Sequence, residues 1–248
     1  MAKSNPIPYR ALLLDLDGTL IDIDMEMFIP AYIQLLAHSF SGHCTTEDFA
    51  GHLLGSTRVM IENNEPRTTN QTAFFDDFCR RLDQPYAHVY PIFERFYELQ
   101  FCRLQSFSRP RPHARCLVNT ARRFGLKLAL ATNPLFPLAA VAHRLRWGDL
   151  TTDLFDLITT VENSHYCKPR PEYYLEIAGK LGVSPEECLM AGNDVLEDLC
   201  AAAAGMDTFL VEGMILNQTK GEPECTYRGS LEELANLIAG EYCDLKKR

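Results

Sequence analysis

Near the N-terminus, a short apolar run leads directly into two closely spaced carboxylates. Residues 11–14 read Ala-Leu-Leu-Leu, and Asp15 and Asp17 follow, with Gly18 and Thr19 behind them. The run indicates a buried strand, and ligands of open α/β sheets bind beyond the carboxyl ends of strands. The two carboxylates therefore stand where chemistry is expected. Asp and Gly are also frequent turn residues, so this stretch alone leaves an ordinary strand-to-turn connection open.

Similar apolar runs recur along the chain, with helical segments between them. We expect strands near residues 11–15, 127–132, 157–160, 188–191 and 208–211. Strands that alternate with helices are typical of βαβ units and a parallel sheet. The sequence therefore predicts an α/β fold with a Rossmann-like parallel-sheet core.

Several connecting segments carry helix start and stop signals. Ser184 and Ser230 each begin a capping box, with a glutamate three residues later. Pro171 is placed to open a helix that stops at Gly182. The alanine-rich run 199–204 is expected to form a helix whose small side chains allow close packing on the sheet.

The alternation is absent between residue 22 and residue 108. Residues 25–40, 73–82 and 92–104 instead show apolar side chains at helical spacing, many of them aromatic. A stiff Arg-Pro-Arg-Pro segment at 109–112 ends the stretch. The simplest account is an all-α domain of residues 22–108 inserted into an α/β core of residues 1–21 and 109–248. We interpret most of its aromatic residues as the core of a helical bundle.

Three later polar stretches also follow apolar runs. Thr132 and Asn133 follow the second strand, Lys168 follows the third, and Asp194 follows the fourth, with Asp198 four residues on. Each has an ordinary alternative, since Thr132-Asn133 could be a turn and Lys168 a solvated loop charge. Only their order along the chain relative to Asp15 favours a functional role over these alternatives.

This set, spread from Asp15 to Asp198, resembles the haloacid dehalogenase (HAD) superfamily of aspartate-nucleophile, Mg²⁺-dependent phosphatases. The insertion point after the first strand resembles the C1-type helical cap of the phosphoglycolate phosphatase and beta-phosphoglucomutase branch. The resemblance covers nearly the whole chain, and it implies a HAD-type core whose cap closes over the site and selects the substrate.

By this resemblance, Asp15 is the nucleophile that forms an aspartyl-phosphate, and Asp17 is the general acid and base. Carboxylates beside a phosphate repel it unless a cation intervenes, and Mg²⁺ prefers oxygen ligands. The implied metal ligands are Asp15, the main-chain carbonyl of Asp17, and Asp194. Asn193 stands where some relatives have an acidic residue, which leaves open whether position 193 or 194 reaches the metal.

The remaining motif residues are implied to bind and neutralise phosphate. Thr132 offers a hydroxyl, Asn133 offers an amide, and Lys168 adds a positive charge beside the aspartyl-phosphate. Asp198 is implied to orient Lys168 or a metal-bound water, with direct ligation of the metal as the alternative.

Other reactions of the superfamily fit less well. Dehalogenases lack the second acid of the first motif, which is present here as Asp17. Phosphonate hydrolysis uses a lysine of the cap, and no lysine lies between Lys3 and Lys127. A sugar-phosphate mutase needs basic groups in the cap, for which Arg58 is one candidate. Phosphomonoester hydrolysis leads, with a mutase or a non-catalytic binding or regulatory family member as alternatives.

Substrate choice is expected to reside in the cap. Residues 51–58 are the best candidate for a specificity loop, and Arg58 could bind a second anionic group there, although a solvated surface arginine is an equal interpretation. The expected partner is a small phosphorylated metabolite. The sequence carries no signal for the oligomeric state.

Composition excludes some classes of protein. The net charge of −9 over 248 residues argues against non-specific nucleic-acid binding. No apolar stretch reaches the roughly 20 residues of a membrane span, and residues 1–6 lack a signal-peptide core. The nine cysteines form no Cys-x-x-Cys pair, which fits reduced thiols. We therefore expect a cytoplasmic protein.

Overall fold

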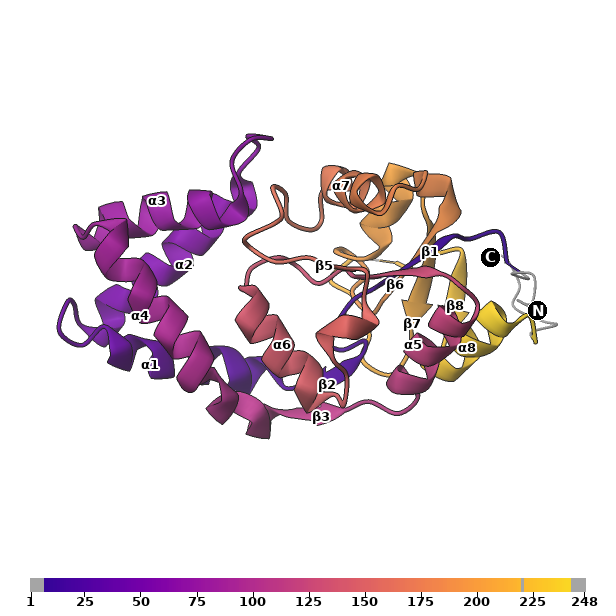
Figure 1. Cartoon of the computed structure of the whole chain (residues 1–248), viewed down its shortest axis with the longest axis horizontal. Coiled ribbons are helices and arrows are strands. Elements are labelled where there is room, and N and C mark those ends of the chain that lie inside the picture. Colours follow the sequence, from indigo (N-terminus) through magenta and orange to yellow (C-terminus); the bar gives the residue numbers. More distant parts are fainter. Residues whose placement is uncertain (1–6, 220, 242–248) are drawn as a thin grey trace.

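The computed structural model describes residues 7–219 and 221–241, so the prediction made on residues 1–6 lies outside it. Six parallel strands form one sheet in the order β5-β4-β1-β6-β7-β8, and helices pack around it (Figure 1). This confirms the predicted α/β fold. The strands are β1 Ala11–Leu14, β4 Lys127–Leu130, β5 Leu157–Ile158, β6 Cys188–Gly192, β7 Asp207–Val211 and β8 Tyr227–Gly229.

Strand β1 lies at the centre of the sheet, between β4 and β6. All four of its residues are buried, and alternate side chains point to opposite faces. Leu12 and Leu14 join one apolar cluster with α5 (Ala114–Arg123) and α8 (Leu231–Ala239). Ala11 and Leu13 join a second cluster with α7 (Pro171–Leu181). Helices on both faces bury the sheet and leave its carboxyl-terminal edge as the place for a site.

Residues 25–107 form four helices and a 3₁₀ turn, which gather at one end of the molecule, beyond α6 (Leu138–Trp147) (Figure 1). The elements are α1 Met25–Ser39, α2 Thr46–Glu62, α3 Asn70–Leu82, α4 Tyr86–Leu99 and η1 Phe101–Phe107. A two-stranded antiparallel ribbon, β2 Ile21–Ile23 with β3 Ser108–Pro110, joins this helical segment to the rest. The division into separate domains at residues 22 and 108 stays a prediction.

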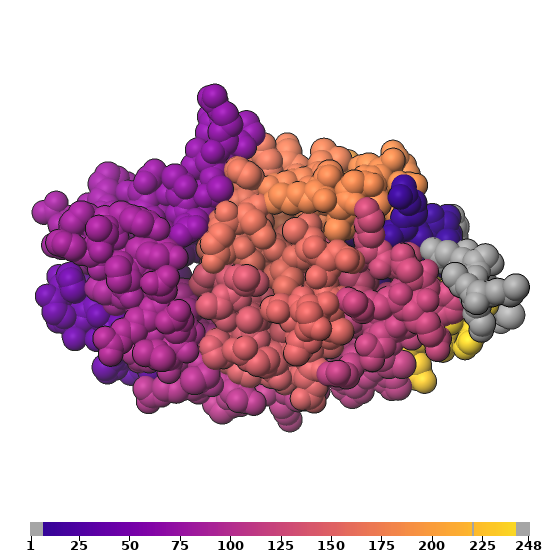
Figure 2. All heavy atoms as spheres, viewed as in Figure 1, coloured from indigo at the N-terminus to yellow at the C-terminus, as the bar shows by residue number. Residues whose placement is uncertain are grey.

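Aromatic packing holds the helical segment together, as its composition predicts. Phe40, Phe78 and Phe93 are buried at the centre of the bundle, with ring centroids 5.2–5.8 Å apart. The same apolar cluster continues across the boundary, where Phe28 of α1 meets Phe136 at 6.5 Å and Trp147 at 6.3 Å. In the space-filling view, the purple helical segment packs directly against the salmon part of the core (Figure 2).

Some predicted elements are wrong in kind or extent. The expected specificity loop at residues 51–58 is part of helix α2, because Thr45 caps a continuous amphipathic run. The run 199–204 forms a 3₁₀ helix, η4 Leu199–Ala204, and the capping box at Ser184 opens only a 3₁₀ turn, η3 Pro185–Glu187. The predicted helix at 92–104 is instead α4 followed by η1. The three-residue strands β2, β3 and β8 were not predicted.

Two further expectations are met. Pro171 and Gly182 bound helix α7, and the capping box at Ser230 starts helix α8.

Among the helices of residues 7–219 and 221–241, none combines the length and the apolar character needed to cross a bilayer.

Candidate active site

The predicted motif residues meet at the carboxyl-terminal edge of the three central strands. Asp15 follows β1 directly, Thr132 lies two residues after β4, and Asp194 lies two residues after β6. Because β1 pairs with both β4 and β6 in parallel, all three strands end on the same edge. The amide of Asp15 donates to the Ala191 carbonyl at 3.0 Å, which fixes the first motif beside the last.

Lys168 is the centre of this cluster. The Nζ atom of Lys168 donates to Oδ1 of Asp15 at 2.9 Å and to Oδ1 of Asp198 at 2.6 Å. Lys168 as a whole is only 1% exposed. Burial alone would lower the pKa of Lys168, but the charges of Asp15 and Asp198 outweigh it and raise that pKa well above its usual value. The solvated-loop alternative for Lys168 is therefore wrong in this structure. Lys168 is a buried cation held between two carboxylates.

Asp198 has a second contact that shapes the loop after β6. Its Oδ2 accepts from the Asp194 amide at 2.8 Å, so it orients both Lys168 and the turn that carries Asp194. A Cβ at Gly192 would lie 2.0 Å from the same oxygen, which makes glycine necessary there. Burial raises the pKa of Asp198, and the positive charge of Lys168 opposes that rise.

Asn193 and Asp194 differ in what they can still bind. The side chain of Asn193 accepts from the Thr19 hydroxyl at 2.9 Å and donates to the Met214 carbonyl at 2.8 Å. Both its polar atoms are thus used to clamp the first motif to the last loop. Gly18, with φ of +80°, leaves room for this clamp, since a Cβ there would meet the Asn193 amide at 2.4 Å. One oxygen of Asp194 accepts from the amides of Leu196 and Glu197 at 2.8 and 2.9 Å, and its other carboxylate oxygen is not used in these bonds.

At the same edge, Thr132 is buried and the side chain of Asn133 is hydrogen-bonded. The Thr132 carbonyl accepts from the hydroxyls of Thr159 and Tyr173 at 2.7 and 2.8 Å, which anchors the loop after β4. Asn133 Oδ1 accepts from the Lys168 amide at 3.3 Å, and its Nδ2 donates to Oε1 of Glu197 at 3.0 Å. The Asn133 amide therefore organises the site and is not free to turn toward a phosphate without giving up these bonds.

Two site residues escaped the sequence reasoning. Glu197 is close to both Asp15 and Asp194, and its pKa is raised by burial first and by those charges as well. Arg144 of α6 is 1% exposed and donates to Oδ2 of Asp17. A signal existed for Arg144, because it falls three and four residues after the apolar Val141 and Ala140 on the buried stripe of its helix.

Arg144 is buried, Asp17 is partly buried, and the hydrogen-bonding capacity of this pair is incompletely satisfied. Asp17 Oδ1 and two guanidinium nitrogens of Arg144 have no hydrogen-bond partner among the described residues. The guanidinium carbon lies 4.6 Å from the centroid of the Phe136 ring. Burial raises the pKa of Asp17, while the charge of Arg144 acts to lower it. Three buried polar atoms on this side of the site are therefore unsatisfied among the described residues.

Arg58 forms its ion pair within its own helix. Its side chain is 79% exposed on α2 and forms an ion pair with Glu62 at 2.8 Å. The predicted role in substrate binding remains untested, and the surface interpretation agrees with this exposure.

The donor chemistry at this edge fits a Mg²⁺ ion. Asp15, Asp194 and the Asp17 carbonyl all offer oxygen, which is the ligand atom that Mg²⁺ prefers. Within residues 7–219 and 221–241, no three carboxylate, imidazole or thiolate side chains form a ready-made metal cluster. The implied set does not need one, since it uses two carboxylates, one main-chain carbonyl and water.

Comparison with known proteins supports the same assignment. The haloacid dehalogenase-like hydrolase family matches residues 9–205. The chain is 31% identical to a putative phosphatase, YhcW, of Bacillus subtilis over 56% of this chain and 60% of that protein. It is 24% identical to the phosphoglycolate phosphatase of Thiobacillus denitrificans over 84% of this chain and 86% of that one. The crystal structure of a HAD phosphatase from Thermococcus onnurineus superposes with a TM-score of 0.58, at 20% identity over 94% of this chain and all of that one.

Proposed function

The chain belongs to the haloacid dehalogenase-like hydrolase family, and from that premise we propose that it is a Mg²⁺-dependent phosphatase. It hydrolyses a small phosphomonoester through an aspartyl-phosphate on Asp15. Relatives named as phosphatases over more than four fifths of this chain support the reaction class.

One observation carries the proposal: the buried ammonium of Lys168 lies 2.9 Å from Asp15 Oδ1. A buried ion pair is costly to desolvate and is weak evidence for stability, so its presence calls for a functional reason. Phosphate provides one, because the same cation that contacts Asp15 also neutralises the incoming phosphoryl oxygens. Asp198 holds Lys168 from the other side at 2.6 Å and keeps it at the site.

The steps follow from these positions. A carboxylate oxygen of Asp15 attacks phosphorus, and the bond to the leaving alcohol breaks as Asp17 donates a proton to its oxygen. Water then attacks phosphorus of the acyl-phosphate, Asp17 takes the proton, and Asp15 leaves as a carboxylate. Burial, which raises the pKa of Asp17, favours the protonated form that the first step needs.

The residues that would hold Mg²⁺ are Asp15, Asp194 and the Asp17 carbonyl. When bound, the ion supplies positive charge that offsets the repulsion between phosphate and carboxylates. The chain itself preorganises these groups, through the clamp of Thr19 to Asn193 and the bond from the Asp194 amide to Asp198.

The alternatives have less support. A mutase would draw on basic groups of the helical segment, yet Arg58 and Arg67 are exposed and paired with Glu62 and Glu65. A non-catalytic family member would have lost part of the set, and Asp15, Asp17 and Lys168 are all present in contact with their partners.

Hydrolysis of p-nitrophenyl phosphate with Mg²⁺ tests the proposal. We expect activity that EDTA removes and Mg²⁺ restores, and that Asp15→Asn abolishes with the fold intact. Asp76→Asn, an exchange at an exposed position of α3, is the matched control and should keep wild-type activity. Equal rates with and without divalent ion, or an active Asp15→Asn protein shown by mass spectrometry to be free of deamidation, would rule the mechanism out.

A further inference from the structure

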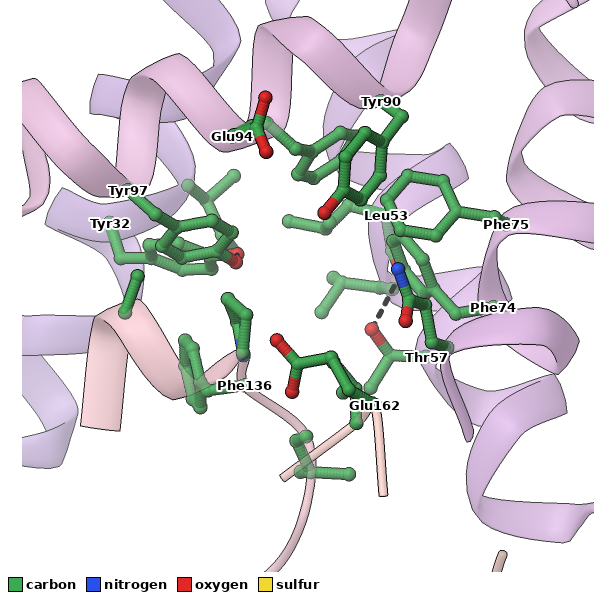
Figure 3. Close-up of a pocket in the computed structure, with 18 of the residues that line it drawn as sticks. Tyr32, Leu53, Thr57, Phe74, Phe75, Tyr90, Glu94, Tyr97, Phe136 and Glu162 are labelled. Carbon is green, nitrogen blue, oxygen red and sulfur yellow. Dashed lines mark hydrogen bonds between the residues drawn. The ribbon is translucent and has the colours of Figure 1, made fainter. Parts of the chain in front are cut away.

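A cavity of about 260 Å³ lies between the four helices α1–α4 and the loops that follow β4 and β5 (Figure 3). This is close to the lower end of typical small-molecule sites, roughly 300–1,000 Å³. Its wall is aromatic and mostly buried, and the rings come from three helices and one core loop. They belong to Tyr32, Phe74, Phe75, Phe93, Tyr97 and Phe136.

The rim of the cavity is acidic. Glu94 and Glu98 of α4 and Glu162, which follows β5, are exposed members of the lining. Figure 3 shows Glu94 and Glu162 on opposite sides of the cavity, with aromatic rings flanking the space between them. A ligand seated on the rings would therefore meet a carboxylate on either side.

These carboxylates have no cationic partner in the described part of the chain. Glu94, Glu98 and Glu162 form no ion pair there, and the residues that line the cavity include no lysine, arginine or histidine. Glu162 only accepts from the Leu138 amide at 3.1 Å, at the start of α6. One cation does lie against the wall, since Arg144 sits over the Phe136 ring, and it is paired with Asp17.

The negative charge of these carboxylates acts on Tyr90, an aromatic residue that lines the cavity. Burial raises the pKa of the Tyr90 hydroxyl, and the nearby charges of Glu94 and Glu162 raise it further. Aromatic faces and carboxylates both attract a cation, and each attraction grows when the cation loses water. An anionic or purely apolar ligand would leave these carboxylates without a counter-charge.

We propose that this cavity binds an organic cation with an apolar body, whose ammonium group lies between Glu94 and Glu162 while the body contacts the rings. The cation has two possible sources. It is either the leaving-group part of the phosphorylated substrate, which rests on the phosphatase function proposed above, or a separate small amine.

The position of the cavity makes the first source physically reachable. Leu135 and Phe136 of its wall follow Asn133 by two and three residues. Three residues of chain span at most about 10 Å, so the wall begins within that distance of the phosphate-side loop. A small ester is therefore long enough to span the distance between that loop and the wall of the cavity.

Calorimetric titration of the full chain tests binding without any turnover. The probes are 2-phenylethylammonium, the neutral 2-phenylethanol and the anionic 3-phenylpropionate. We expect the cation to bind at least about tenfold more tightly than the alcohol, and the anion more weakly still. The double variant Glu94→Gln/Glu162→Gln should lose that preference, and its glutamine at 162 keeps an oxygen to accept from the Leu138 amide.

Glu186→Gln is the matched control, because it removes an exposed glutamate from η3, which precedes β6 at the opposite edge of the sheet. It should keep the full preference for the cation. Circular dichroism of each variant checks the fold. No binding, equal binding of the three probes, or an unchanged preference in a folded double variant would overturn the proposal.

Two esters separate the sources. They are the phosphate monoester of phenylalaninol, which carries an amine, and 3-phenylpropyl phosphate, which does not. A higher kcat/KM for the amine ester that disappears in the double variant identifies the leaving group as the cation. Equal kcat/KM with the calorimetric preference intact identifies a separate amine. If neither ester nor p-nitrophenyl phosphate is hydrolysed, the phosphatase function fails, while the calorimetric result still decides whether the cavity binds cations.

Discussion

The carboxyl-terminal edge of the sheet contains buried charged residues, whereas the interior of the helical segment 25–107 is packed with aromatic residues. At the sheet edge, Asp15, Lys168 and Asp198 are buried and joined by ion pairs. In the helical segment, buried phenylalanines and tyrosines contact one another ring to ring. The first arrangement costs stability and has a chemical purpose, while the second supplies stability through apolar burial.

This difference determines what each region can tell us about function. A buried charge tolerates few substitutes, so the polar residues at the strand ends indicate one chemistry. An apolar core accepts many residues of similar size, so the same aromatic pattern serves a bundle core or a ligand pocket equally well. The reaction class is therefore easier to infer than the substrate.

The two regions nevertheless share one apolar cluster. Phe28 contacts Phe136 and Trp147 across the boundary, and Arg144 joins the Phe136 ring to Asp17. A change of packing in the helical segment thus has a short physical route to Asp17.

The largest expected effect comes from the polar side of this comparison. Lys168→Met removes the cation and leaves two carboxylates together in a buried site. We expect kcat for p-nitrophenyl phosphate to fall by about 10²–10³-fold, as for other lost electrostatic stabilisers. Lys180→Met on α7, at a partly exposed ion pair with Glu176, is the control and should change kcat little. A folded Lys168→Met protein with wild-type kcat would show that the buried cation has no catalytic role.

A smaller effect is expected at the boundary between the regions. Arg144→Met removes the charge that opposes the raised pKa of Asp17, so that pKa should rise further. A carboxyl whose pKa is raised in the folded state stabilises the folded protein while it is protonated. Its contribution to the free energy of unfolding is lost as pH rises through the folded-state pKa. The loss of unfolding free energy relative to wild type should therefore grow as pH rises from the folded-state pKa of Asp17 in wild type to its higher value in the variant.

Urea unfolding of Arg144→Met at several pH values measures this trend. Arg95→Met removes an exposed arginine of α4 instead, and should show no pH-dependent difference from wild type. A loss of stability in Arg144→Met that is the same at every pH would mean that Arg144 acts through packing on Phe136 alone.

The smallest effect is expected on the helical segment's surface. Arg58 is exposed and paired with Glu62, so Arg58→Ala should change kcat/KM by less than about twofold for any phosphomonoester, because exposed ion pairs contribute little. A panel of metabolite phosphates measures this. A rise in KM that is large for one substrate and absent for p-nitrophenyl phosphate would restore Arg58 as a contact for a second anionic group.

The sequence predicted the sheet edge well because strand, turn and polar residue are adjacent in the chain there. Asp15, Thr132 and Asp194 each follow an apolar run, and parallel pairing alone brings them together. Lys168 was assigned by order, and its burial required the fold. Contacts between distant segments, such as Arg144 with Asp17 or Asn193 with Thr19, have no local signal for their partner.

Helix α2 was missed for a physical reason as well. Its stretch 46–62 contains two glycines, a serine and two threonines, which favour loops when read locally. Packing of buried Phe49, Leu53 and Met60 on neighbouring helices overrides that preference. The cavity was not foreseen either, since aromatic spacing indicates a helix face and not whether the facing helices leave space.

Trapping the covalent intermediate tests the central claim, that the buried pair of Asp15 and Lys168 makes Asp15 a nucleophile. The enzyme is quenched with acid during turnover of p-nitrophenyl phosphate, reduced with borohydride, and digested for mass spectrometry. An aspartyl-phosphate is reduced to homoserine, so we predict homoserine at residue 15 only in the presence of substrate and Mg²⁺, and none in Asp15→Asn. Active enzyme that yields no homoserine, or homoserine at Asp17 instead, would contradict the account.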